Sequence, residues 1–349
     1  MPQEAGPSPP SSEPLPNFES TPAPYQVPLE MQDMQPSPEE LTSSTFLTHG
    51  GQVAPGSVAL CLAVRDAHED ILEWLLHHKR LGVTRVYLWD NKSVPPMNAT
   101  IEAHIASGFV AYNYFDRFTH PTGAPQLFAY DRCLEEGRPL HAWMGFIDVD
   151  EFLIFRGGAG PIRHLGQYLS TKHSQAAGLA VHWILFGSSG HMDRPASGVL
   201  RSFVKCLPLR HAQHQLVKTI VRLDCTAAAW SPHAFHHNCS GQSVARTDGS
   251  PIEGPRAEEP THVDLALHHY ATKSRRDFEQ KMVRGSGMKR QRGWEYFNFV
   301  DSWSVVWNFD ALRIWDDGAI RTIRDPAAAA AALEQYRAEM HEDHWLKGP

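Results

Sequence analysis

Apolar residues along the chain fall into two alternating patterns, short continuous runs and runs with helical spacing. Residues 57–66 (SVALCLAVRD) form a continuous apolar run that ends in charged residues, which is typical of a buried strand. Residues 69–83 (EDILEWLLHHKRLGV) place leucines at helical spacing, which predicts an amphipathic helix. The apolar part of the sequence therefore begins with a strand followed by a helix.

The same alternation continues as far as residue 155. The pattern predicts strands at 83–91, 109–116 and 146–155 and helices at 99–107 and 126–137. Apolar strands separated by helices are typical of a parallel sheet built from βαβ crossovers. We therefore expect an α/β fold with a mostly parallel sheet flanked by helices.

Beyond residue 155 the alternation is looser, with shorter connections between the apolar runs. The pattern predicts strands at 176–187, 198–206, 216–224 and 263–271, and a helix at 274–285. Residues 240–261 are polar, with several Gly and Pro, and predict a surface loop.

Composition separates the two ends of the chain from its centre. Residues 1–55 are rich in Pro, Ser, Glu and Gln and offer few apolar side chains to offset ordering entropy, so they predict a disordered arm. Residues 326–349 are rich in alanine and predict a C-terminal helix. The intervening residues 56–325 are expected to form the folded domain.

Charge and hydrophobicity exclude several classes of protein. With 349 residues, 42% of them hydrophobic, the chain can bury a large core. Its formal net charge of −7 gives no general attraction to nucleic acid, so no nucleic-acid partner is expected. No apolar stretch reaches the roughly 18 to 20 residues of a membrane helix, and the N-terminus lacks a signal-peptide pattern. We expect no membrane anchor within this sequence.

The cysteines and histidines do not predict a zinc site. None of the cysteines lies in a CxxC arrangement, and buried free thiols are the favoured interpretation. One disulfide among Cys206, Cys225 and Cys239 remains an alternative if the protein is secretory. The HxxH spacings at His211 and His214 and at His233 and His236 lack a HExxH motif or a nearby cysteine pair.

Acidic residues end four of the predicted strands, at Asp66, Asp90, Asp116 and Asp148. In open α/β sheets, ligands bind beyond the carboxyl ends of the strands, so these acids lie where a binding site is expected. Asp148 and Asp150 form an Asp-x-Asp pair within FIDVDEFLIF, an otherwise apolar segment. Two carboxylates with open coordination positions suit Mn²⁺ or Mg²⁺, and such an ion is commonly shared with a diphosphate.

Several segments, taken in order, resemble glycosyltransferase family 92. They are residues 58–93, FIDVDEFLIF, WILFGSSGH, VKTIVR and LHHYATKSRRDFEQKMVRG, and the resemblance spans about residues 57–300. It implies a GT-A fold, which is a Rossmann-like nucleotide-diphospho-sugar transferase fold. It also implies a UDP-sugar donor, UDP-galactose first, a divalent metal ion, a glycan acceptor and inversion at the anomeric carbon.

The resemblance also implies roles for individual residues. Asp148 and Asp150 match the metal-binding Asp-x-Asp motif, and His269 matches the histidine that completes the metal site. Lys273, and after it Lys281 and Arg284, are placed to contact diphosphate oxygens. The strand-end residues Arg65, Asp66 and Asp90 are placed to border the nucleotide. Each of these three has an alternative as a capping or salt-bridged loop residue.

An inverting transfer also requires a general base on the acceptor side. Asp193 is the candidate, because it follows a predicted strand and a Gly/Ser loop that would border the acceptor. The alternatives left open are His191, Asp264, His236 and Glu151. Trp183 in the same segment is a candidate to stack on a sugar ring, although an aromatic residue in an apolar strand is more often core.

Two other functions remain open at this point, an inert GT-A-like domain that binds a sugar or a protein, and a metal-dependent phosphoesterase. The family resemblance implies the Golgi lumen and a membrane anchor, and the sequence contains two glycosylation sequons, at Asn98 and Asn238. Membrane association is therefore possible without an anchor in the sequence given.

Overall fold

The computed structural model describes residues 48–49, 52–116, 125–156, 164–285 and 292–312. Its first half alternates strands and helices as predicted: β3 (Val58–Val64), α3 (His68–Arg80), β4 (Arg85–Asn91), a 3₁₀ turn (Met97–Ala99), α4 (Glu102–Ala106), β5 (Val110–Phe115), α5 (Pro125–Gly137), β6 (Trp143–Phe146) and β7 (Glu151–Phe155). A short antiparallel pair, β1 (Thr48–His49) and β2 (Gln52–Val53), precedes them.

The second half contains more, shorter strands. Its elements are α6 (Leu165–Lys172), β8 (Gly178–Leu185), α7 (Val199–Ser202), β9 (Lys205–Cys206), β10 (Val217–Arg222), β11 (Thr226–Ala229), β12 (Phe235–His237), β13 (Val244–Arg246), β14 (Pro251–Ile252), β15 (Leu265–His269), α8 (Arg275–Arg284), α9 (Trp294–Trp303) and β16 (Val306–Trp307), with 3₁₀ turns at Ala212–Gln215 and Leu223–Cys225. The predicted C-terminal helix at 326–349 and most of the predicted arm at 1–55 lie outside the described residues.

One ten-stranded sheet forms the centre of the described fold, in the order β14-β13-β8-β10-β6-β3-β4-β5, with β15 beside β8 and β7 beside β15. Strands β6, β3, β4 and β5 are parallel neighbours, whereas β10 is antiparallel to both β6 and β8. The predicted α/β class, a central sheet flanked by helices, is confirmed.

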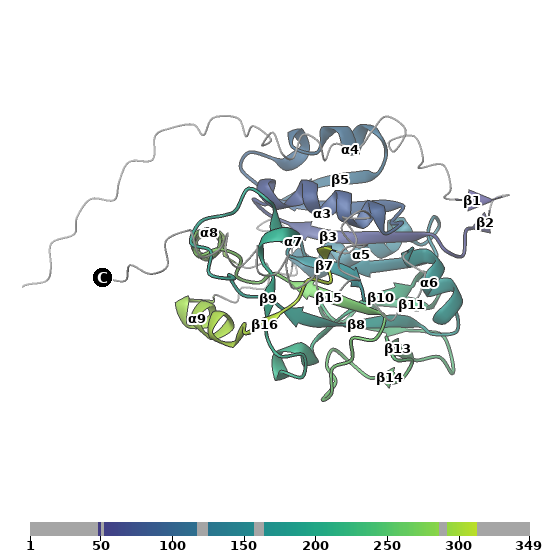
Figure 1. Cartoon of the computed structure of the whole chain (residues 1–349). Coiled ribbons are helices and arrows are strands. Elements are labelled where there is room, and N and C mark those ends of the chain that lie inside the picture. Colours follow the sequence, from purple (N-terminus) through teal and green to yellow (C-terminus); the bar gives the residue numbers. More distant parts are fainter. Residues whose placement is uncertain (1–47, 50–51, 117–124, 157–163, 286–291, 313–349) are drawn as a thin grey trace, which may run out of the picture.

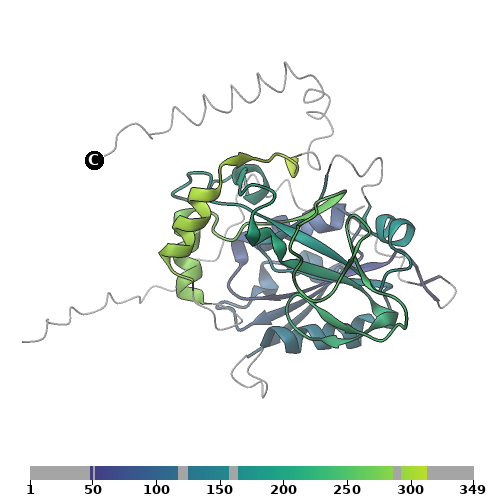
Figure 2. The same cartoon turned by 90° about the horizontal axis from the view of Figure 1, so that it is seen from below.

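Helices cover both faces of the parallel part of the sheet, which explains why its strands are continuously apolar. On β3, Leu60 and Leu62 belong to the core that includes α3, whereas Ala59 and Cys61 belong to the core that includes α5. Helices α8 and α9 lie together at one end of the sheet, with β1 and β2 at the opposite end (Figures 1 and 2).

Three predicted segments differ from the structure. The single strand expected at 146–155 is two strands, β6 and β7, which lie in different parts of the sheet and are joined by the turn that contains both aspartates. The strand expected at 198–206 begins as helix α7, because the Glu73 carboxylate of α3 accepts the N–H groups of Val199 and Leu200 (2.6 and 3.0 Å). The loop expected at 240–261 contains β13 and β14, since β13 pairs with the edge of β8.

The prediction of free thiols is wrong for four of the five cysteines. Disulfides join Cys61 of β3 to Cys133 of α5 and Cys225 to Cys239, and Cys206 is free and buried. The first pair is 72 residues apart in sequence, and only the packing of α5 against the sheet brings its Cα atoms to 6.0 Å.

Candidate active site

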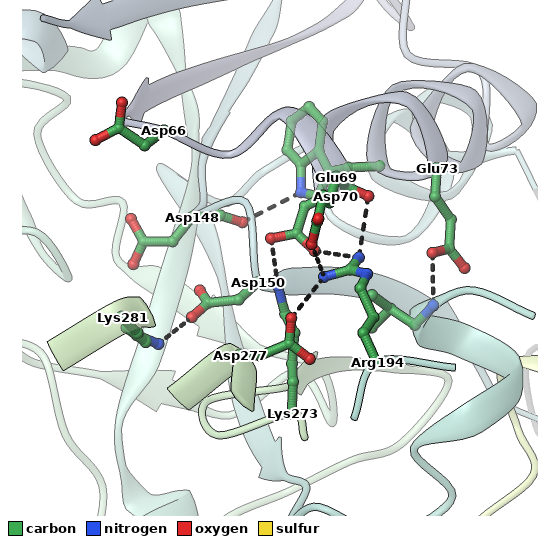
Figure 3. Close-up of polar contacts among 12 residues, drawn as sticks. Asp66, Glu69, Asp70, Glu73, Asp148, Asp150, Arg194, Lys273, Asp277 and Lys281 are labelled. Carbon is green, nitrogen blue, oxygen red and sulfur yellow. Dashed lines mark hydrogen bonds and ion pairs between the residues drawn. The ribbon is translucent and has the colours of Figure 1, made fainter. Parts of the chain in front are cut away.

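The turn between β6 and β7 carries both aspartates of the Asp-x-Asp pair. The Glu151 N–H donates to the Asp148 carbonyl (3.0 Å), and the Asp148 N–H donates to the Glu151 carboxylate (2.8 Å). Trp74 of α3 donates its indole N–H to the Asp148 and Glu151 carbonyls (3.1 and 2.9 Å). Helix α3 therefore fixes the turn, and the Asp148 and Asp150 side chains leave it on the same side (Figure 3).

Asp150 meets two residues from the C-terminal half of the chain. Its Oδ2 lies 3.8 Å from Nε2 of His269, the last residue of β15, and 2.6 Å from Nζ of Lys281 on α8. Pairing of β15 with both β7 and β8 places His269 opposite Glu151, one residue from Asp150. Burial by itself would raise the pKa of Asp150, but Lys281 and His269 hold it well below its usual range. Asp150 is therefore an anion at neutral pH.

Asp148 is held by residues that sequence reasoning missed. Gln126 of α5 donates to its Oδ1 (2.8 Å), and Lys218 of β10 donates to its Oδ2 (3.0 Å). Lys218 is buried and also lies 3.6 Å from Oε2 of Glu151. Burial, opposed by Lys218, raises the pKa of Glu151 to about 8. A lysine inside the apolar strand VKTIVR was the available signal, because a fully buried lysine is rare unless it is paired.

Asp150 and His269 are the two side chains that could bind a divalent ion together at this site. Two donors about 2.1 Å from one ion lie at most about 4.2 Å apart, so the 3.8 Å between Asp150 Oδ2 and His269 Nε2 fits shared coordination. Burial lowers the pKa of His269, which favours the neutral form that binds metals. Among the described residues, no three His, Cys, Asp or Glu side chains are grouped closely enough to hold a metal ion. Asp148, Asp150 and His269 are thus brought together without forming a ready-made set of three donors.

A cavity of about 530 Å³ opens beside the aspartates. The ends of β3, β4 and β5 contribute Arg65, Asn91 and Phe115 to its wall. Trp183, Lys218, His233 and His269 line another part, and Lys281, Arg284 and Arg292 add positive charge. The volume falls in the roughly 300 to 1,000 Å³ range of sites for one small ligand, and the basic wall suits an anionic one.

The residues predicted to border the nucleotide differ in their placement. Arg65 lines this cavity. Asp66 does not; its Oδ1 accepts the Val94 N–H (2.9 Å). Asp90 is fully buried and accepts hydrogen bonds from Ser93 N, Met97 N and Tyr112 Oη (2.9, 2.9 and 2.7 Å). The structure thus gives Asp90 the role of organising the loop after β4.

Lys273 belongs to a separate group of charges, which we call the Arg194 cluster: Glu69, Asp70, Arg194, Lys273 and Asp277 (Figure 3). Arg194 lies 2.7 Å from Asp70 and 3.0 Å from Asp277, and Lys273 pairs with the other oxygen of Asp70. Burial alone would raise the pKa of Asp70, but Arg194 and Lys273 lower it well below its usual range. The cluster joins the start of α3 to the start of α8.

A second, wider cavity of about 1,300 Å³ adjoins the first, and the Arg194 cluster lies in its wall. Asp150, Lys281 and Arg284 line both cavities. The bond from Lys281 to Asp150 and the bond from Arg284 to the Asp66 carbonyl (3.1 Å) therefore lie between them.

Asp193, the predicted base, is exposed at the surface and pairs with Arg276 (3.0 Å), and it does not line the cavity of the aspartates. The four alternative candidates for the general base also lie outside the wall of the cavity beside the aspartates. Asp264 pairs with Lys172 (2.7 Å), His191 lies against the Ser202 carbonyl (3.2 Å), and Glu151 is buried beneath the turn. His236 is exposed and stacks on Trp230. Trp183, the sugar-stacking candidate, does line the cavity.

Comparison with known proteins identifies the family. The sequence profile described as Glycosyltransferase family 92 matches residues 57–291, which include the Asp-x-Asp turn, β15 and α8. This chain belongs to glycosyltransferase family 92. The match confirms the resemblance drawn from the segments around Asp148 and His269.

Curated relatives carry the same family name. A glycosyltransferase family 92 protein of Ricinus communis is 30% identical over 159 residues, which are 45% of this chain and 28% of that protein. One from Oryza sativa subsp. japonica is 31% identical over 170 residues, 48% of this chain and 27% of that protein. The alignments thus cover less than a third of the length of these relatives.

Among solved structures, S. aureus TarS residues 1–349 match 48% of this family 92 chain and 47% of their own, with a TM-score of 0.29 and 11% identity. A likeness of this size supports no statement about mechanism. None of the helices in the described part of the chain is long and apolar enough to cross a membrane.

Proposed function

We propose that this family 92 chain transfers a hexose, with galactose as the first candidate, from a UDP-sugar to a glycan acceptor with inversion and with Mn²⁺ or Mg²⁺. The observation that carries the proposal is the meeting of Asp150 and His269, from distant segments, in a cavity lined by Lys281, Arg284 and Arg292. Two ligands for a hard cation beside three basic side chains suit a diphosphate.

Each part of the cavity has a task in such a transfer. Lys281, Arg284 and Arg292 would stabilise negative charge on the departing diphosphate, an electrostatic contribution on the order of a few kcal/mol per well-placed donor. A divalent ion held by Asp150 and His269, when bound, supplies further neutralisation of that charge. Lys218 and Gln126 hold the Asp148 carboxylate in one orientation, and Trp183, which is 5% exposed, adds apolar surface to the cavity wall.

The two disulfides support a location in the lumen of the secretory pathway, the Golgi apparatus included. Disulfides persist in oxidising compartments and are rare in the cytosol. Here one disulfide joins β3 to α5, and the other, Cys225 to Cys239, closes the base of the β11–β12 pair.

A donor screen tests the proposed function. The purified chain is incubated with Mn²⁺ and a panel of UDP-hexoses, and the released UDP and the product linkage are measured with and without glycan acceptors. We expect Asp150→Asn to lower turnover by at least about 100-fold, because it weakens both the metal pair and the Lys281 contact. The unfolding temperature should stay within a few degrees of wild type.

The control is Asp224→Asn, a surface carboxylate with 73% exposure, which should leave turnover unchanged. Unimpaired turnover of Asp150→Asn would contradict the site. Binding of UDP without turnover would indicate an inert binding domain, and phosphate release from simple esters would indicate a phosphoesterase.

A further inference from the structure

The proposed transfer requires a group that removes the proton of the attacking hydroxyl, and the cavity wall offers four carboxylate or imidazole side chains: Asp148, Asp150, His233 and His269. Three of them are already engaged, the two aspartates by protein donors and His269 by the Asp150 carboxylate. Both oxygens of Asp148 accept from Gln126 and Lys218, and Oδ2 of Asp150 accepts from Lys281. Nε2 of His269 faces Asp150. His233 is the exception.

The tautomer of His233 follows from its backbone contact. Its Nδ1 lies 2.8 Å from the Val217 carbonyl oxygen. A carbonyl oxygen can only accept, so Nδ1 carries the hydrogen and Nε2 keeps its lone pair. In the described part of the chain, no residue forms a hydrogen bond with Nε2 of His233. The ring therefore presents an unused acceptor on a residue of the cavity wall.

The position of this ring is fixed from several directions. The backbone N–H of His233 donates to Ser231 Oγ (3.1 Å), and its carbonyl accepts from Thr219 Oγ1 (2.9 Å). The Trp183 ring contacts the imidazole edge to face, with 5.4 Å between centroids. Such preorganisation is what a proton acceptor needs, because no side-chain reorientation is required when the hydroxyl approaches.

The charges around His233 keep it neutral. Burial, reinforced by Lys218, lowers the pKa of His233 to about 4, while the Val217 carbonyl and Asp148 act in the opposite direction. The groups whose charges act on it are Lys218 of β10, Asp148 of the turn and His269 of β15. At pH 7 the ring is unprotonated and able to accept a proton.

We propose that His233 is the general base of the transfer, an inference that rests on the proposed function. As the acceptor hydroxyl oxygen forms its bond to the anomeric carbon, the bond from that carbon to the β-phosphate oxygen breaks, and its electron pair leaves with UDP. The hydroxyl proton moves to Nε2 of His233 and is later released to water. Asp193, exposed and paired with Arg276, has no part in this step.

Release of UDP from a UDP-hexose with water as the acceptor tests this role without knowledge of the glycan. The full chain is assayed with Mn²⁺ and UDP-galactose, or with the UDP-hexose that the wild type turns over fastest. We expect His233→Gln to lower kcat by roughly 10² to 10⁴-fold, the usual range for a general base. The Kd for UDP, measured by calorimetry, should stay within about twofold, because the proposed role of His233 concerns the acceptor hydroxyl and not the diphosphate.

His236→Gln is the matched control, since His236 lies in the same segment, is exposed, and stacks on Trp230 outside the cavity wall. It should keep wild-type turnover. Added imidazole should restore part of the rate of His233→Gly, which a purely structural role would not produce.

An active His233→Gln protein would overturn this assignment alone. If added imidazole does not restore the rate, and UDP binding weakens as much as the rate falls, the assignment of His233 as the general base is also overturned. Its role would then be structural. A wild type that releases no UDP from any UDP-hexose would instead overturn the proposed function, and this assignment with it.

Discussion

Two neighbouring groups, the Asp150 site (Asp148, Asp150, His269 and Lys281) and the Arg194 cluster, both pair aspartates with basic residues but differ in how far the basic residues reach solvent. In the Arg194 cluster, the side chains of Asp70, Asp277, Lys273 and Arg194 are 8–18% exposed, and only Glu69 at its edge is more exposed, at 45%. In the Asp150 site, Asp150 and His269 are 14% and 7% exposed, but their neighbours Lys281 and Asp148 are 31% and 35% exposed. A charged partner that reaches solvent can move from the aspartate to a bound ligand, whereas a buried ion pair stabilises the fold.

The difference in exposure between the two groups also explains why Lys273 and Lys281 have different roles, although both follow His269 closely in the sequence. Lys273 comes directly before helix α8 and points into the Arg194 cluster, whereas Lys281 lies two turns into the helix, over Asp150. The capping box of Ser274 and Asp277 fixes the start of the helix between them, and Asp277 is itself bound to Arg194. The structural cluster thus positions the helix that carries the functional lysine.

The largest expected effect is on the free energy of unfolding, from a substitution that removes Arg194 at the centre of the Arg194 cluster. Arg194→Met leaves Asp70 and Asp277 buried with fewer partners, so we expect it to lower the free energy of unfolding by about 3 to 5 kcal/mol. Urea unfolding measures this. Arg132→Met, which removes a pair on α5 that is 45% and 60% exposed, is the control and should cost less than about 1 kcal/mol. Equal effects of the two changes would refute the structural role of the cluster.

Removal of the cation over Asp150 should show the reverse pattern. We expect Lys281→Met to weaken UDP binding about 10 to 100-fold, since a hydrogen bond to a charged group contributes about 1.5 to 3 kcal/mol. The free energy of unfolding should fall by less than in Arg194→Met, because this change removes a partner from one buried carboxylate, whereas Arg194→Met removes a partner from two.

The matched control for Lys281→Met is Arg276→Met on the same helix, which removes a surface pair with Asp193. Calorimetric titration with UDP should give this variant the wild-type Kd. If Lys281→Met destabilises the fold as much as Arg194→Met does, the distinction between the two groups fails.

The pH dependence of the Arg194 cluster gives a smaller effect. The folded pKa of Asp70 lies below its unfolded value near 3.8, so the unfolded chain takes up the proton first. The contribution of the Asp70–Arg194 pair to the free energy of unfolding is present above the unfolded pKa of Asp70, near 3.8. It is lost as the pH falls through the folded pKa of Asp70. The stability difference between wild type and Arg194→Met should therefore be the same at pH 7 and pH 5 and should narrow by about 1 kcal/mol near pH 3. If the stability difference between wild type and Arg194→Met already narrows above pH 5, protonation of Asp70 is not the cause.

The amino-acid sequence by itself determined the parallel half of the sheet and the identity of the Asp-x-Asp turn. Continuous apolar runs and helical spacing are local patterns, and they gave β3, β4, β5, α3 and α5 correctly. The family resemblance, now confirmed by the profile match, depended on motifs that are also local in the chain. The same patterns failed where a contact from elsewhere decides the structure, as with Glu73 at the start of α7.

Only the tertiary structure decided which charged residues meet. Asp150 and His269 are brought together by the pairing of β7 with β15, and Lys218 reaches Asp148 because β10 runs antiparallel beside β6. Neither contact has a local signature, since each depends on strand partners chosen far along the chain. The same holds for the Cys61 to Cys133 bridge and for His233, whose free nitrogen is defined by a carbonyl group sixteen residues away.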